Sequence, residues 1–323
     1  MTFAEKRYAG ATLRISLTLV LFLLLMLLRG VAAAFLPTLT AGLSDASAQV
    51  AETLLQALCY ALCFLLPAWA FFLWPNDTHA VPLDLSPRMP RGVLHYVFFG
   101  VAVTGAAAFF NAQIVNIFHY GDFSSEVLWE SEVASNLQLA LMLVELVVVP
   151  AFVEELLFRG VILSNLLPFG KGTAVLGSAL LFGLMHQNAE QLLYATAAGV
   201  VLGWIFVQTY SIWPCVLMHF VNNFHSVLQT ALLSRLPGAS TELALYVLQG
   251  VLMALGIFCG IRLLCKGQQG DGNVPEVLEN TDVCALSVGR RVRLFFNVPM
   301  ILFVAWCIAS MLLLIMMSMA MYY

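Results

Sequence analysis

The strongest constraint on this chain is a series of apolar runs that are long enough to cross a lipid bilayer. A transmembrane helix needs about 20 predominantly apolar residues. We predict nine spans, at residues 12–36, 50–74, 93–118, 137–166, 173–188, 191–209, 213–233, 243–265 and 297–321. The runs therefore predict an all-α protein, a polytopic transmembrane helical bundle.

Composition supports a membrane location and argues against other partners. Charged residues make up 10% of the chain and hydrophobic residues 61%, whereas a soluble domain carries about 25% charged residues. Lys and Arg are sparse and form no basic face, so we expect the lipid bilayer and no nucleic acid as a partner. The seven cysteines show no metal-ligand spacing and are interpreted as small core residues.

One long polar segment divides the chain. Residues 267–296 contain several glycines and a proline, which predicts a flexible linker loop. This loop separates an eight-helix transmembrane core, residues 1–266, from an additional C-terminal transmembrane helix, residues 297–323. The last helix carries no charge after residue 299, so we interpret it as a lipid-facing anchor.

Charges outside the apolar runs predict an orientation. Basic residues fall before the first span and on alternate loops, and the loops between them are acidic, with Arg235 as the main exception. The basic residues are Lys6, Arg7, Arg14, Arg88, Arg91, Lys171, Arg262, Lys266, Arg290, Arg291 and Arg293. The positive-inside rule then places the N-terminus in the cytoplasm. We expect an integral membrane protein, of the plasma membrane if the source is bacterial.

The fourth predicted span contains charges that an apolar helix does not need. A charge at the bilayer centre costs about 2.5–3.5 kcal/mol on insertion scales, so such residues indicate a functional site. Glu155 and Arg159 are four residues apart and can pair on one face. Glu154 points about 100° away and faces another group. A purely structural ion pair is the alternative for Glu155 and Arg159, and Glu145 is interpreted as structural.

Two later spans add histidines and an asparagine at a matching depth. Taken singly, His186, His219 and Asn223 are as well explained by helix packing. However, Glu154 precedes Gly170 by 16 residues and His186 follows it by 16. In a helical hairpin both positions lie roughly 18–24 Å from the turn. His219 and Asn223 enter from the same end, so these side chains are predicted to converge.

This set of side chains is suited to hydrolysis of an amide. A carboxylate beside a histidine can take a proton from water, and a histidine with an asparagine can donate hydrogen bonds to an oxyanion. No motif for a covalent nucleophile stands out. Glu154, His186 and His219 could also hold Zn²⁺, which would activate the water itself. We favour a site with no metal and no cofactor and keep zinc as the alternative.

Three short motifs carry a resemblance to a known family. Residues 154–160 resemble its E-E-x-x-x-R motif, residues 182–186 its F-x-x-x-H motif, and residues 219–223 its H-x-x-x-N motif. The order and helical placement also agree, and the motif-bearing part spans residues 137–230. The chain thus resembles the CPBP family of intramembrane endopeptidases, also called Abi or type II CAAX protease-like.

The resemblance implies a fold and a set of roles. It implies an eight-helix bundle whose active site opens to the cytoplasmic side and whose substrates are membrane-associated or lipidated proteins or peptides. The implied roles are water activation by Glu154 and His186, an oxyanion site at His219 and Asn223, and organisation of the first motif helix by Glu155 and Arg159. Family members have been described both as metalloproteases and as glutamate proteases, and we favour the glutamate type.

Two other functions compete with proteolysis. The first is a non-catalytic membrane scaffold or bacteriocin-immunity protein of the same family, although every motif residue is present here. The second is a transporter with Glu154, Glu155 and His186 as a proton relay. No internal repeat supports a transporter.

Overall fold

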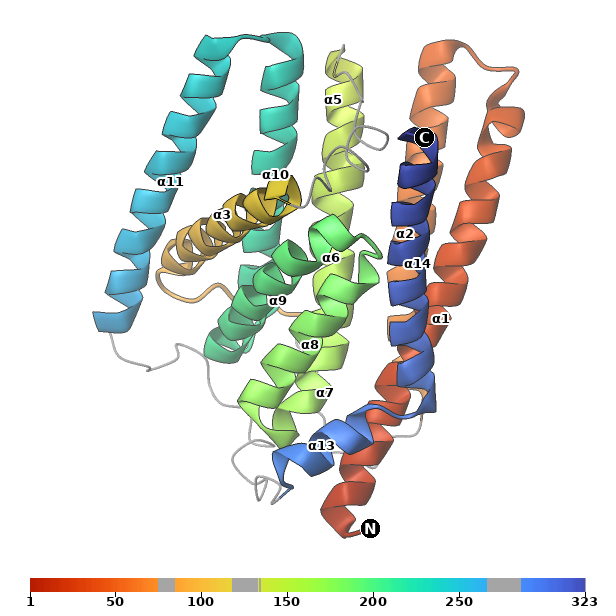
Figure 1. The fold of residues 1–323 in the computed structure, drawn as a ribbon, viewed down its shortest axis with the longest axis vertical. Helices are drawn as coiled ribbons and strands as arrows, with labels where there is room; N and C mark the ends of the chain where they lie inside the picture. Colours follow the sequence, from red (N-terminus) through yellow and green to blue (C-terminus); the bar gives the residue numbers. More distant parts are fainter. Residues whose placement is uncertain (75–84, 118–132, 134, 266–285, 323) are drawn as a thin grey trace.

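The computed structural model describes residues 1–74, 85–117, 133, 135–265 and 286–322, and these residues form helices without strands (Figure 1). Six helices are long and apolar enough to cross a membrane. They are α1 (Phe3–Thr40), α2 (Asp45–Leu73), α3 (Val93–Ile117), α9 (Ala189–Thr209), α11 (Ala239–Cys265) and α14 (Val298–Tyr322). The predicted helical membrane bundle is confirmed.

The other three predicted spans differ from ordinary membrane helices, and they carry the motifs. Residues 136–169 form a continuous but irregular helical run in place of the predicted span 137–166. The run consists of α5 (Asn136–Met142), a π-helical stretch (Leu143–Val148), α6 (Val149–Glu155), a second π-helical stretch (Leu156–Leu163), α7 (Ser164–Leu166) and a 3₁₀ turn (Leu167–Phe169). Helix α8 (Lys171–Met185) is only 15 residues long. Helix α10 (Trp213–Arg235) carries four polar motif-region side chains, His219, Asn222, Asn223 and His225.

Glycines bring α8 and α9 into close contact. A Cβ atom at Gly199 would lie 2.8 Å from the Cα of Ala179, and one at Gly183 would lie 2.8 Å from the carbonyl oxygen of Leu192. Any larger residue at either position would force the two helices apart. The tight packing fixes the end of α8, where His186 lies, against the start of α9.

The segment predicted to be a linker is partly helical. Residues 288–295 form α13 (Val288–Phe295), with the hydroxyl of Ser287 accepting a hydrogen bond from the backbone of Arg290. Arg290 Nε donates to Glu5 Oε1 of α1 at 2.7 Å, and Arg291 donates to Thr173 Oγ1 of α8 at 3.0 Å. The linker prediction is therefore wrong for residues 288–295. Its first part, residues 267–285, lies outside the described residues.

Helix α14 packs along α1 and is more than an anchor in lipid (Figure 1). Met300, Phe303 and Cys307 are fully buried, while Leu302 on another face is 59% exposed. Trp306 Nε1 also donates to Gln187 Oε1 at 3.1 Å. The interpretation of α14 as a lipid-facing anchor is therefore incomplete, because one face is buried and Trp306 contacts the residue that follows the motif histidine.

Candidate active site

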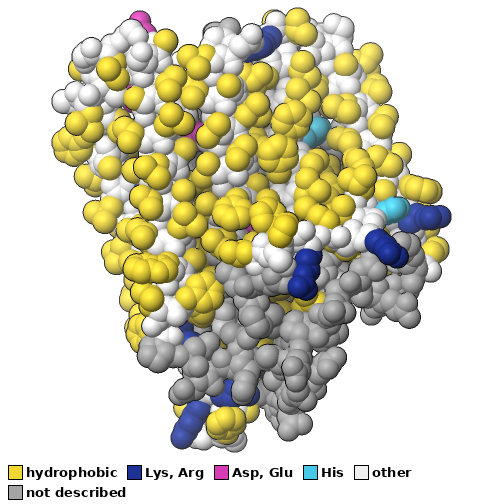
Figure 2. Space-filling model, turned by 180° about the vertical axis from the view of Figure 1, so that it is seen from behind, with side chains coloured by type: hydrophobic (Ala, Val, Ile, Leu, Met, Phe, Trp, Pro, Cys, Tyr) yellow, Lys and Arg dark blue, Asp and Glu magenta, His cyan; other side chains and the backbone are white. Residues whose placement is uncertain are grey.

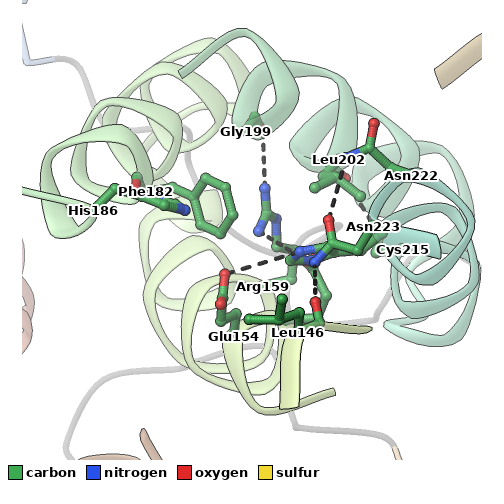
Figure 3. Close-up of polar contacts among 12 residues, drawn as sticks. Leu146, Glu154, Arg159, Phe182, His186, Gly199, Leu202, Cys215, Asn222 and Asn223 are labelled. Atoms are coloured by element: carbon green, nitrogen blue, oxygen red, sulfur yellow. Dashed lines mark hydrogen bonds and ion pairs between the residues drawn. The ribbon is translucent and has the colours of Figure 1, made fainter. Parts of the chain in front are cut away.

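A pocket of about 520 Å³ lies between the motif helices and α1, α2 and α9. Four predicted site residues, Glu154, His186, His219 and Asn223, line it. The other two, Glu155 and Arg159, are fully buried behind its wall. The structure therefore brings together side chains from three separate helices, as Figure 3 shows around Phe182.

Glu155 is held between a guanidinium and a histidine. Its Oε1 accepts from Arg159 at 2.8 Å, so the predicted pair is present. The same oxygen lies 2.8 Å from His219 Nδ1, on α10. Because an ionised carboxylate only accepts hydrogen bonds, Nδ1 of His219 carries the proton. Glu155 therefore orients His219 as well as its own helix, a contact that sequence reasoning did not predict.

Arg159 connects three helices at a position with no exposed surface. Besides Glu155, it donates to the carbonyl oxygen of Gly199 on α9 at 3.2 Å. Its guanidinium lies 4.6 Å from the centroid of the Phe182 ring, a cation–π contact with α8 (Figure 3). A planar guanidinium can stack on the Phe182 ring and donate hydrogen bonds to Glu155 and Gly199 at the same time, which an ammonium group cannot do.

Glu154 offers one carboxylate oxygen to the pocket. Its Oε1 accepts a hydrogen bond from the Tyr60 hydroxyl of α2 at 2.6 Å. Its Oε2 is buried, has no hydrogen-bond partner among the described residues, and lies 4.0 Å from His219 Nε2. A buried acceptor without a partner is costly. An atom in this state is suited to binding water or substrate.

His186 also keeps one ring nitrogen for the pocket. Its Nδ1 lies 2.8 Å from the carbonyl oxygen of Phe182, one helical turn earlier. A carbonyl accepts only, so Nδ1 must donate, and in neutral His186 the lone pair is then on Nε2. The end of α8 therefore fixes the tautomer that a general base requires.

Asn223 compensates for a proline in the first motif helix. Pro150 lies four residues after Leu146 and has no N–H, so the α-helical hydrogen bond to the Leu146 carbonyl cannot form. Asn223 Nδ2 donates to this carbonyl at 2.9 Å. An amide nitrogen has two protons, so one remains for the pocket. Asn223 thus has a structural contact in addition to its predicted role.

Sequence reasoning missed several polar residues of the pocket. Tyr60 lies in an apolar helix far from the motifs and gave no signal. Asn222 was not among the predicted site residues, yet it accepts from Thr104 at 2.9 Å and donates to the Tyr194 hydroxyl at 2.6 Å. Glu145 was interpreted as structural, but it lines the pocket, as does Arg29 of α1. Arg29 lies over the ring of Tyr60, with 5.2 Å between the guanidinium carbon and the ring centroid.

We predict that Tyr60→Phe lowers kcat about 10- to 150-fold and leaves KM nearly unchanged. Loss of a hydrogen bond to a charged group costs about 1.5–3 kcal/mol, and about 1.4 kcal/mol corresponds to a factor of ten in rate. Steady-state kinetics on a membrane peptide measure the effect. Tyr194→Phe is the matched control, because its hydroxyl bonds Asn222 and no carboxylate. Equal losses of kcat in Tyr60→Phe and Tyr194→Phe would show that Tyr60 has no specific role in catalysis.

The donor atoms do not form a compact metal-binding group. Within the described part of the chain, no three His, Cys, Asp or Glu side chains lie close enough together to hold a metal ion. The ring nitrogens of His186 and His219 that face away from the pocket are each bonded to an oxygen. That pattern fixes the rings for catalysis and also occurs in histidines that ligate metals.

Comparison with known proteins identifies the motif-bearing segment. Residues 136–225 match the model of a family described as type II CAAX prenyl endopeptidase Rce1-like. The match covers under a third of the chain and contains all six predicted site residues. No curated protein and no solved structure matches the chain. The match supports the resemblance drawn from the three motifs.

Proposed function

We propose that this chain, whose segment 136–225 is of the Rce1-like CAAX endopeptidase type, is an intramembrane endopeptidase. It hydrolyses peptide bonds of membrane-associated or lipidated proteins with an activated water. The observation that carries the proposal is the Oε2 atom of Glu154, a buried acceptor at the wall of the pocket that has no hydrogen-bond partner among the described residues.

Glu154 and His186 act on the water. Glu154 Oε2 and His186 Nε2 are both acceptors that line one pocket, so a water between them can donate both of its protons. Glu154 takes one proton as the water oxygen attacks the carbonyl carbon of the substrate. The C–N bond then breaks, and the proton passes from Glu154 to the departing amine. The carboxylate is restored after each cycle.

His219 and Asn223 stabilise the oxyanion. His219 lies between two carboxylates, with Nδ1 at 2.8 Å from Glu155 Oε1 and Nε2 at 4.0 Å from Glu154 Oε2, and both favour its protonated form. In that state His219 donates through Nδ1 to Glu155 and through Nε2 toward the pocket. Together with the second amide proton of Asn223, this provides two donors for the carbonyl oxygen as its negative charge develops.

We predict that cleavage needs no metal. With Glu154 as the base, activity survives exhaustive chelation, and purified active protein contains no stoichiometric zinc. Elemental analysis alongside a cleavage assay measures both. Chelator-sensitive cleavage that added zinc restores, with one zinc bound per chain, would make Glu154, His186 and His219 the ligand set instead.

The experiment that tests the function is a cleavage screen of membrane peptides by the reconstituted protein beside its Glu154→Gln variant. Cleavage by the native chain alone supports the proposal. Binding of a membrane partner without cleavage would favour the non-catalytic scaffold or bacteriocin-immunity function. Uptake of a solute by sealed proteoliposomes would favour a transporter. In each case the N-terminus is proposed to lie in the cytoplasm.

A further inference from the structure

On the first motif helix and on α10, most of the pocket lining lies on one side of the site, while Ala195, Ala198 and Leu202 of α9 also line it. On the first motif helix its lining residues are Met142, Glu145, Leu146 and Pro150, which precede the motif, and Glu154, its first residue. On α10 the lining continues from His219 to Thr230. Both stretches run roughly 16–18 Å along the helix axes at 1.5 Å per residue. The pocket thus extends toward the end where α5 begins and α10 ends.

These two helix ends lie at one level. Arg235, the last residue of α10, donates to the Asn136 side chain at the start of α5 at 2.9 Å. On α8 the only lining residues, Phe182 and His186, lie at the helix end remote from Lys171. We name the end with Asn136 and Arg235 the pocket end of the bundle.

The N-terminus lies at the opposite end. The rings of Tyr8 and Phe169 are in contact, with centroids 4.9 Å apart, so the start of α1 adjoins the turn that precedes α8. The contacts of Arg290 with Glu5 and of Arg291 with Thr173 place α13 at the same level. In Figure 1 the N-terminus, α13 and the start of α8 all lie at the bottom. We name this the N-terminal end.

The two ends differ in charge. Lys6, Arg7, Lys171, Arg290, Arg291 and Arg293 belong to the N-terminal end, together with Glu5. Asp45, Glu52 and Glu242 belong to the helix ends at the pocket end, together with Arg235. Figure 2 shows the same asymmetry, with most Lys and Arg side chains on the lower part of the surface. By the positive-inside rule, the N-terminal end is cytoplasmic.

We infer that substrate enters this site from the non-cytoplasmic side of the membrane. The substrate class is then a segment of an exported or membrane-anchored protein at the outer leaflet, and a lipidated C-terminus in the cytosol is excluded. The occupant is a substrate only if the proposed function holds, but the side of entry does not depend on it. A cytoplasmic N-terminus and a site opening to the cytoplasm, both expected from the sequence, are incompatible in this fold.

Labelling of cysteines with a membrane-impermeant maleimide tests the inference without an activity assay. Ser226 lines the pocket and is exposed, and Ser240 is exposed just after the turn that follows α10. Ser226→Cys and Ser240→Cys are each compared with the parent chain in spheroplasts and in inside-out vesicles. The native Cys265, exposed at the far end of α11, reports on the N-terminal end.

We expect both introduced cysteines to react in spheroplasts and Cys265 to react only in inside-out vesicles. Labelling of Ser240→Cys only in inside-out vesicles would overturn the orientation. Labelling of Ser240→Cys from outside while Ser226→Cys stays unreactive from that side would overturn the entry route. If Ser226→Cys does not accumulate, Thr230→Cys takes its place, since Thr230 also lines the pocket. Failure to detect cleavage would leave these results unchanged.

Discussion

Glu154→Gln is expected to reduce cleavage about 100- to 10,000-fold, the range that general acid–base catalysis contributes. The amide keeps the size of the carboxylate and can still accept from Tyr60, but it cannot take a proton from water. The fold should therefore survive, because the fully buried ion pair of Glu155 and Arg159 is untouched. Single-turnover cleavage in proteoliposomes, at matched protein levels, measures the loss.

Glu145→Gln is the matched control. Glu145 is another carboxylate of the same pocket, nine residues before Glu154 on the same helical run. We place it outside the reacting group and expect a change in rate of less than about threefold, which is within 1 kcal/mol. Near-normal cleavage by Glu154→Gln, or an equal loss in Glu145→Gln, would contradict the role of Glu154 as the base.

Arg159→Ala is expected to destabilise the protein by about 3–5 kcal/mol, the usual cost of removing one partner of a buried ion pair. Both side chains of the pair have 0% exposure. The substitution also leaves the Gly199 carbonyl without its donor and removes the cation from the face of Phe182. Thermal unfolding in detergent, with and without denaturant, measures the change.

Arg290→Ala supplies the comparison for this prediction. Its bond to Glu5 is equally short, at 2.7 Å, but the arginine side chain is 34% exposed. Solvent-exposed pairs contribute little to stability, so this variant should melt close to the native chain. The melting temperature of Arg159→Lys should lie between those of Arg159→Ala and Arg290→Ala. The ammonium group keeps the charge but lacks the forked N–H donors of the guanidinium. Equal melting temperatures for Arg159→Ala, Arg159→Lys and Arg290→Ala would show that His219 alone stabilises the buried Glu155.

The sequence predicted the class of fold and several of the residues that line the pocket because both depend on local signals. Long apolar runs identified the six clear membrane helices. Charges and histidines inside such runs identified Glu154, His186 and His219 without any knowledge of packing. The pairing of Glu155 with Arg159 followed from helical spacing alone.

Contacts between distant helices had no local signal. Tyr60 meets Glu154 across 94 residues, and Glu155 meets His219 across 64. Nothing in an apolar stretch indicates which tyrosine faces a carboxylate. The π-helical stretches that flank α6 were also missed, since hydrophobic periodicity does not distinguish a locally widened turn from an α-helix.

The helicity of residues 288–295 was missed for a different reason. Glycines and a proline earlier in the segment dominated the interpretation, whereas the later part has a capping serine and two arginines that bond to α1 and α8. Composition averaged over 30 residues concealed a helix of eight. Tertiary contacts with α1 and α8, which the sequence cannot show, stabilise it.

The hydrogen bond from Trp306 to Gln187 sets an order of events during biosynthesis. Gln187 has a left-handed backbone with φ of 52°, unusual for a residue with a side chain. Its partner Trp306 is translated 119 residues later. A nascent chain in which all three motifs have been inserted therefore still lacks α14, whose Trp306 donates a hydrogen bond to Gln187. The hydrogen bond to Gln187 can therefore form only after residue 306 has been translated and α14 has packed against α1.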